Sequence, residues 1–217
     1  MAKTFAVSGQ HYLFDVQAFA HTILALGGDS YEYALRDRTT QGVIDDVAAG
    51  AADIGVLMVT DQTQGEVFAA LEAAGLEFTE LAESTPRIAL GASHPLSNAK
   101  KLTLEDLADW PYLYFDQGAD APAAFAEEAL GDVPRAKSIA CTDRASLSEL
   151  ATAMNGYTVT SGILVGITDG GSLTTVELDT PVKLHLGYVT KKGQEISEIG
   201  QRFVVNLQKS LKLYARF

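Results

Sequence analysis

Strand-like and helix-like segments alternate along this chain in two blocks, and this alternation limits the possible folds more than any other feature. Residues 53–59, Asp-Ile-Gly-Val-Leu-Met-Val, form a nearly unbroken apolar run of the kind found in strands buried on both faces. Segments with helical periodicity lie before and after it. Because strands that alternate with helices form parallel sheets covered on both faces, the sequence predicts an α/β protein.

The first block is expected to contain three strands and three helices. Its first helix carries one apolar stripe and stops at a pair of glycines, and its second helix has a threonine at the start and a glycine after the end. In chain order we expect a strand over 3–8, a helix over 12–26 ended by Gly27 and Gly28, a strand over 31–35, a helix capped by Thr39 or Thr40 and closed by Gly50, the strand 53–59 and a helix over 64–74.

The second block repeats this pattern and is followed by a final strand and a final helix. Pro122 lies near the first turn of one expected helix, where the missing N–H of proline is tolerated. We expect strands over 112–116, 136–141 and 157–160, helices over 122–130 and 143–154, a last strand over 182–188 and a closing helix from about Ser197.

Two such blocks predict two Rossmann-like lobes. The strand-rich segments near 86–110 and 170–186 would join the lobes in two crossovers. We therefore expect lobe I to comprise 1–90 plus 183–217, and lobe II to comprise 91–182. Ligands of open parallel sheets bind beyond the carboxyl ends of the strands, so the expected ligand site is the cleft between the lobes.

Composition argues against several classes of partner. The formal charge of −12, from 28 acidic and 16 basic residues, opposes binding of nucleic acid by this chain alone. The single cysteine, Cys141, excludes an intramolecular disulfide and fits a reducing compartment. The N-terminus has no signal-peptide pattern, and no apolar run is long enough to span a bilayer. We therefore expect a cytoplasmic protein that does not enter membranes.

The sequence carries no motif of catalysis or metal binding. His11, His21, His94 and His185 are scattered, and the chain has neither a His-Glu-x-x-His pattern nor a cysteine pair. It also lacks the Gly-x-Ser-x-Gly elbow of hydrolases and the glycine-rich loops that bind nucleotides. We expect no enzymatic activity, no metal and no cofactor.

Six segments of the chain match a known family in sequence, order and spacing: 7–12, 43–56, 88–96, 102–107, 142–146 and 155–162. Together they resemble the effector-binding domain of LysR-type transcriptional regulators, over essentially the whole chain. The resemblance implies a fold like that of the type 2 periplasmic binding proteins, with a small-molecule inducer in the cleft and side-by-side dimers. It also implies that the chain is the sensor part of a longer protein whose winged helix-turn-helix binds DNA.

The first strand-to-helix junction, Ser8-Gly9-Gln10-His11, is the leading candidate for a ligand contact. Unpaired amides of the first helical turn and the helix dipole favour a carboxylate there. A simpler alternative is that Ser8 only caps the helix and that Gly9 only relieves the turn. The family resemblance favours the ligand role.

Two further junctions and three wall residues complete the expected site. Arg144 could bind a ligand carboxylate through two hydrogen bonds, or it could form a surface ion pair. Met58 is placed there by the layout of the family, but a methionine could equally belong to the core. Outside the first junction, the expected ligand contacts are therefore Met58, Phe115, Gln117, Thr142, Arg144, Thr160 and Ser161.

One stripe of the first helix is a candidate surface for self-association. Phe14, Ala18 and His21 lie beside the core-facing stripe, which wider burial within the chain would also explain. In the family that the chain resembles, this helix packs on the second lobe of another copy. We therefore expect a homodimer through these three residues.

The leading functional hypothesis is an inducer sensor. A small anionic metabolite, a carboxylate or an amino-acid-like molecule, would close the lobes and thereby change the DNA binding of the full-length protein. The alternative is a solute-binding protein that serves a transporter, which the lack of a signal-peptide pattern disfavours.

Overall fold

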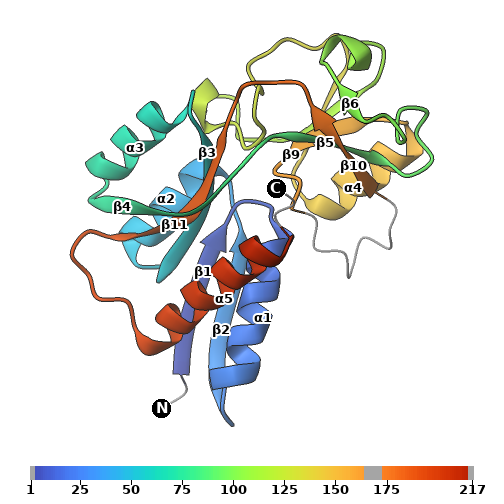
Figure 1. The fold of residues 1–217 in the computed structure, drawn as a ribbon. Helices are drawn as coiled ribbons and strands as arrows, with labels where there is room; N and C mark the ends of the chain where they lie inside the picture. The colour runs from blue at the N-terminus through green and yellow to red at the C-terminus, as the bar shows by residue number, and fades with distance from the viewer. Residues whose placement is uncertain (1–2, 164–172, 215–217) are drawn as a thin grey trace.

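In the computed structural model the chain forms two lobes, each built on its own mixed β-sheet (Figure 1). The structure describes residues 3–163 and 173–214. Helices cover the sheets, and the chain crosses between the lobes twice. The predicted α/β class, with two lobes and two crossovers, is confirmed.

The strand β5 (Arg87–Gly91) determines where the lobes divide. The chain leaves the first sheet after β4 (Leu76–Ser84), and it returns between β10 (Leu173–Leu178) and β11 (Leu184–Lys191). Since β5 pairs with β9 and β10 in the second sheet, the expected lobe boundary after residue 90 falls inside a strand of lobe II.

The sheet of lobe I has the strand order β2-β1-β3-β11-β4. Its first three strands are parallel, whereas β11 runs antiparallel to both of its neighbours. All seven residues of β3 are buried, as the apolar run at 53–59 predicted. The three parallel strands are β1 (Lys3–Gly9), β2 (Tyr31–Asp37) and β3 (Ile54–Thr60).

Four helices cover this sheet, two on each face (Figure 1). On one face the ring of Phe5 lies between Phe19 and Phe203, with centroid distances of 6.0 and 5.8 Å. This aromatic cluster joins the first and last helices and explains why the C-terminal segment returns to lobe I. The helices are α1 (Leu13–Leu26) and α5 (Glu198–Tyr214) on that face, and α2 (Thr40–Ala49) and α3 (Gln64–Ala73) on the other.

The predicted ends of α2 are confirmed. The hydroxyl of Thr39 caps its first turn by accepting a hydrogen bond from the N–H of Gly42, at 3.1 Å. Gly50 follows its last residue with a φ of 74°, a left-handed conformation that favours glycine. Of the two candidate threonines, Thr39 is therefore the cap, and Thr40 is the first helical residue.

The sheet of lobe II has the order β6-β10-β5-β9-β7-β8, and α4 packs against it. The side chain of Asp143 caps α4 by accepting a hydrogen bond from the N–H of Ser146, at 2.8 Å. The remaining elements are β6 (Lys101–Leu102), a 3₁₀ helix η1 (Glu105–Leu107), β7 (Tyr112–Phe115), a 3₁₀ helix η2 (Ala123–Phe125), β8 (Ser138–Cys141), α4 (Arg144–Ala153) and β9 (Tyr157–Thr160).

The helix expected over 122–130 is wrong. Only η2, three residues long, is helical there. The side chains of Glu127 and Glu128 turn inward and accept hydrogen bonds from the backbone N–H groups of His11 and Phe115, respectively, at 2.8 and 2.9 Å. These long-range contacts hold the segment in an irregular loop instead of a helix.

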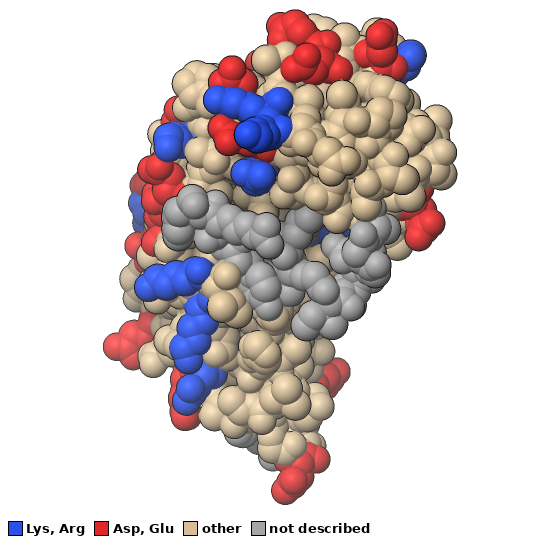
Figure 2. All heavy atoms as spheres, turned by 45° about the vertical axis from the view of Figure 1, so that its right-hand side comes forward, with Lys and Arg blue, Asp and Glu red and all other residues tan. Residues whose placement is uncertain are grey.

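Charges of both signs lie on the two lobes. On the face drawn in Figure 2, Lys and Arg side chains form a small group on each lobe, with Asp and Glu side chains nearby. This face therefore carries no broad area of one sign. Among the described residues, no helix is long and apolar enough to cross a membrane.

Candidate functional site

The β1–α1 turn is fixed by buried polar contacts inside lobe I. Gln10 is fully buried, and its amide oxygen accepts hydrogen bonds from the Met58 N–H and the Tyr12 hydroxyl, at 2.9 and 2.5 Å. Its amide nitrogen donates to the Thr40 hydroxyl at 2.6 Å. Gln10 therefore orients the turn through contacts with Met58, Tyr12 and Thr40.

Ser8 and Gly9 also have structural roles that differ from both sequence interpretations. The Ser8 hydroxyl is buried and donates to Asp46 at 2.6 Å, while the position before α1 is occupied by Tyr12, which makes no side-chain cap. At Gly9 a Cβ atom would lie 2.3 Å from a carboxylate oxygen of Asp15. A larger residue at position 9 would therefore have to displace the Asp15 carboxylate, and Ser8 does not cap the helix.

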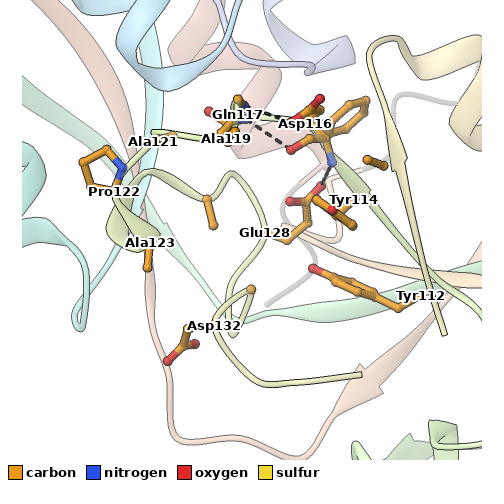
Figure 3. A pocket seen from close by; sticks show the side chains of 15 residues that line it. Tyr112, Tyr114, Asp116, Gln117, Ala119, Ala121, Pro122, Ala123, Glu128 and Asp132 are labelled. Carbon is orange, nitrogen blue, oxygen red and sulfur yellow. Dashed lines mark hydrogen bonds between the residues drawn. The ribbon is translucent and has the colours of Figure 1, made fainter. Parts of the chain in front are cut away.

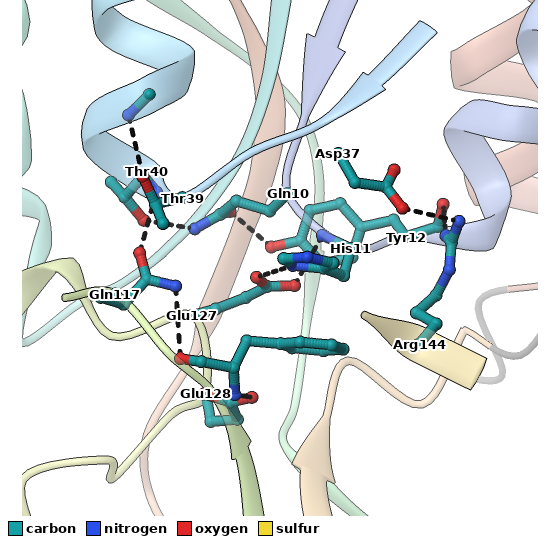
Figure 4. A network of polar contacts seen from close by, with 12 residues as sticks. Gln10, His11, Tyr12, Asp37, Thr39, Thr40, Gln117, Glu127, Glu128 and Arg144 are labelled. Carbon is teal, nitrogen blue, oxygen red and sulfur yellow. Dashed lines mark hydrogen bonds and ion pairs between the residues drawn. The ribbon is translucent and has the colours of Figure 1, made fainter. Parts of the chain in front are cut away.

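His11 receives a carboxylate from the opposite lobe (Figure 4). Its backbone N–H donates to one oxygen of Glu127 at 2.8 Å, and its Nδ1 lies 2.9 Å from the other. The imidazole stacks on the ring of Phe115, with centroids 3.9 Å apart and planes 5° from parallel. Glu127 comes from the irregular loop of lobe II, so this contact joins the two lobes at the junction expected to bind a carboxylate.

The electrostatics of this pair favour a charged histidine. Burial opposes protonation of His11, but the hydrogen bond and charge of Glu127 outweigh it and raise the pKa of the imidazole above its ordinary value. Burial raises the pKa of Glu127 itself, against the influence of His11. The neighbouring Glu128 has its pKa raised well above the ordinary value, first by burial and then by the charge of Glu127.

Arg144 and Thr40 form two more bridges between the lobes. The guanidinium of Arg144 donates to the Tyr12 carbonyl at 2.5 Å and pairs with Asp37 at 3.1 Å (Figure 4). The Thr40 N–H donates to the Gln117 side chain at 2.9 Å, and its hydroxyl donates to the Phe125 carbonyl at 2.8 Å. Arg144 is therefore not paired within its own lobe.

A cavity of about 100 Å³ remains between the lobes next to His11. Thr158 lines it, and the Thr158 hydroxyl is buried without a hydrogen-bond partner among the described residues. Five predicted residues line this cavity, namely His11, Phe115, Arg144, Thr160 and Ser161.

The other expected contacts lie elsewhere. Met58 is 6% exposed and belongs to the core, as its simpler interpretation held. The side chain of Thr142 is exposed, although its backbone makes a hydrogen bond with His11. Gln117 bonds Thr40 and lines a different cavity, in lobe II. Sequence reasoning missed Glu127, whose apolar neighbours gave the segment a helical pattern that hides a buried carboxylate.

Two of the three residues expected at a dimer surface are buried within the chain. Phe14 is 1% exposed, and its ring stacks on the ring of Tyr12 with centroids 4.7 Å apart. Ala18 is fully buried. Neither side chain is available to a second copy, so the wider-burial alternative holds for both. Only His21 is exposed. A charged residue at position 18 would disrupt the core and would not test association.

The described residues contain no group of three or more His, Cys, Asp or Glu side chains placed to hold a metal ion. Two lobes, each with its own mixed sheet, and a small cavity between them define the fold of the type 2 periplasmic-binding-protein-like class. The model of the LysR substrate binding domain matches residues 31–212. The chain therefore belongs to the LysR substrate binding domain family, whose members are regulators and in general are not enzymes.

Solved structures of this family have the same fold. HinK, a LysR family transcriptional regulator from Pseudomonas aeruginosa, aligns with a TM-score of 0.67 and 18% identity over 98% of this chain and 72% of HinK. The effector binding domain of QuiR in complex with shikimate aligns with a TM-score of 0.65 and 12% identity over 100% of both chains. The reduced OxyR regulatory domain from Pseudomonas aeruginosa aligns with a TM-score of 0.64 and 13% identity, over 98% of each chain. No curated protein matches the sequence.

Proposed function

We propose that this domain binds a small anionic metabolite between its lobes and does no chemistry on it, as the inducer-sensing part of a cytoplasmic transcriptional regulator. The observation that carries the proposal is the position of Glu127. A carboxylate already lies at the β1–α1 turn, where the N–H and the ring of His11 hold both of its oxygens. The turn thus supplies the donors that a ligand carboxylate needs.

In this proposal Glu127 stands in for the carboxylate of the effector. A ligand carboxylate would accept the same two hydrogen bonds from His11 and release Glu127, and the rest of the ligand would extend toward the Thr158 hydroxyl. Because Glu127 belongs to lobe II, its release changes how the lobes are held together. A ligand shifts this equilibrium only when it binds one arrangement better than the other. In the full-length protein the shift would alter DNA binding.

Removing the carboxylate of Glu127 tests this proposal directly. Glu127→Ala should lower the stability of the domain by about 3 kcal/mol, because it breaks a buried pair. It also leaves a space of carboxylate size beside His11. Millimolar acetate or propionate should then raise the melting temperature of this variant well above the effect of equal concentrations of chloride.

The controls separate a specific site from a general salt effect. Glu32 is exposed on β2, so Glu32→Ala should respond to acetate no more than the unchanged protein does. The double variant with His11→Ala should respond to acetate much more weakly, because the ring donor is gone and only the backbone N–H of position 11 remains. If acetate stabilises Glu127→Ala no more than chloride does, the β1–α1 turn is not a carboxylate site and the proposal fails.

We also propose that the domain forms a homodimer through the exposed face of α1. Its outer surface includes His21, Leu24 and Ala25, and Leu24 is 84% exposed. Burial of an exposed apolar side chain such as Leu24 against a second copy lowers the free energy of the dimer. This surface replaces the one predicted through Phe14 and Ala18.

A further inference from the structure

Lobe II contains a larger cavity of its own, of about 410 Å³ (Figure 3). Every residue that lines it belongs to the segment 112–140, so lobe I contributes none of its walls. It has only Phe115 in common with the cavity beside His11. The loop that follows β7 arches over it and carries η2. This cavity is therefore separate from the proposed inducer site.

Small residues keep the cavity open, and aromatic rings form one wall. Tyr112 and Tyr114 lie side by side, with ring centroids 5.7 Å apart. Glycine and alanine account for seven of the lining positions, which are Gly118, Ala119, Ala121, Ala123, Ala126, Gly131 and Ala140. An aromatic wall beside an open space is suited to the apolar or cationic part of a small molecule.

The charged groups that line the cavity are all acidic. Asp116, Glu128 and Asp132 line it, and none of its described lining residues is Lys, Arg or His. Glu128 is 5% exposed, and one of its oxygens accepts the hydrogen bond from the Phe115 N–H. Figure 3 shows Glu128 above the ring of Tyr112, with its carboxyl group directed at the backbone nitrogen that donates to it. The cavity thus has a buried acid that faces a cation-compatible wall.

A second buried polar group on the same wall lacks a partner. The hydroxyl of Tyr112 has no hydrogen-bond partner among the described residues, and the side chain is only 3% exposed. In Figure 3 this hydroxyl is directed toward the space between Glu128 and the loop that carries Asp132. Buried polar groups in folded proteins are nearly always hydrogen-bonded, so an unpaired hydroxyl at a cavity wall points to a ligand that completes it.

Arg135 is a cation close to this wall but outside the cavity lining. Its guanidinium lies over the Tyr112 ring, 4.6 Å from the centroid, and is not among the lining residues. Its Nη1 donates to the carbonyls of Leu130 and Val133, which fixes the loop, whereas its Nε and Nη2 are buried without a hydrogen-bond partner among the described residues. The guanidinium thus lies outside the cavity, and Asp116, Glu128 and Asp132 lie on its walls.

We propose that this cavity in lobe II is a second small-molecule site, which takes an organic ammonium ion with a compact aromatic or aliphatic body. The ammonium group donates to Glu128 and the Tyr112 hydroxyl, and the body packs against the tyrosine rings. Burial and the charge of Glu127 raise the pKa of Glu128 well above its ordinary value. A bound cation acts in the opposite direction and favours the ionised carboxyl, so binding is coupled to release of protons.

Titration calorimetry with benzylammonium chloride tests the proposal, with sodium benzoate and benzyl alcohol as probes of equal shape and different charge. Benzylammonium should bind, and the other two should not. Glu128→Gln keeps the acceptor for Phe115 but cannot ionise, so it should weaken binding about tenfold. Two buffers with different ionisation enthalpies should reveal the released proton. Glu149 is exposed on α4 outside the cavity, and Glu149→Gln should bind as the unchanged protein does.

Tyr112→Phe separates a ligand contact from a structural role. Since the hydroxyl has no partner, its removal should leave the melting temperature of the free domain unchanged or higher, while benzylammonium binding falls about tenfold. Binding of benzoate, equal binding to Glu128→Gln, or no binding of benzylammonium up to its solubility limit would overturn the proposal. The probe has no carboxylate, so its failure leaves the test of the His11 site standing.

Discussion

Glu127 couples the two lobes through both of its oxygens. A ligand that binds beside His11 must therefore displace the Glu127 carboxylate. Its side chain is 3% exposed, and His11 supplies a backbone donor and a ring donor. A carboxylate in this environment is stable only while both donors remain, because an unpaired buried charge is strongly unfavourable. Under the proposed function, a ligand that replaces Glu127 at these donors must therefore carry an anionic group.

Cys141 is expected to be a poor sensor of oxidants. It is buried, and burial followed by the charges of Asp143 and Glu128 raises the pKa of its thiol, which lowers the fraction of reactive thiolate. Millimolar hydrogen peroxide should leave the Cys141 peptide of the folded domain unoxidised in peptide mass spectrometry, whereas the same peptide of the urea-unfolded chain should be oxidised. Met154, which is 47% exposed, is followed in its own peptide because peroxide converts methionine to the sulfoxide. Rapid oxidation of the Cys141 peptide in the folded domain would show that the thiol is reachable.

At the scale of elements, the sequence predicted what local chemistry determines. The buried strand β3 and both ends of α2 follow from an apolar run, a threonine and a glycine, and the structure contains all of them. The segment 122–130 has a helical spacing of apolar residues as well. Its conformation depends on what Glu127 meets in lobe I, 116 residues away, and no local pattern encodes that partner.

Some residues of the expected site line the cavity between the lobes, whereas others are held inside lobe I by distant partners. His11, Arg144 and Ser161 follow strand ends or begin helices, and the topology brings them to one cavity. Ser8 and Gln10 occupy the correct junction, but their partners Asp46 and Thr40 lie on α2 and hold them inside lobe I. A strand end therefore predicts the place of a site, and long-range hydrogen bonds decide which side chains face it.

The exposed face of α1 carries the prediction for self-association. Leu24→Glu should shift the domain toward monomers in sedimentation velocity, because it places a charge where an apolar contact is proposed. Leu213, 74% exposed on α5, provides a matched control, and Leu213→Glu should leave the association unchanged. An identical dimer in Leu24→Glu would rule out this face.

For the molecule as a whole, several buried groups favour protonation together. Burial raises the pKa of Asp15 and of Glu128 well above the ordinary carboxyl value, and it also raises the pKa of Glu127. A group whose pKa is higher in the folded state contributes stability below its ordinary pKa and loses this contribution as the pH rises through the folded value. For these carboxyls the loss begins above about pH 4. For His11, whose pKa is raised by Glu127 despite burial, it begins above pH 6.5.

The melting temperature should therefore fall by several degrees between about pH 5 and about pH 9. His94 has the opposite effect on the pH dependence of stability, because burial lowers its pKa. It is one group, whereas the three carboxyls and His11 all favour the protonated form. The formal charge of −12 at pH 7 also destabilises the compact folded state through repulsion between like charges. Added salt screens exposed charges, so melting temperatures measured at several salt concentrations separate this repulsion from the effect of the buried groups. Glu128→Gln is neutral at every pH, so its melting temperature should depend less on pH, while the exposed control Glu32→Gln should follow the unchanged protein. A melting temperature that rises over this range would show that these carboxyls are already ionised in the folded domain.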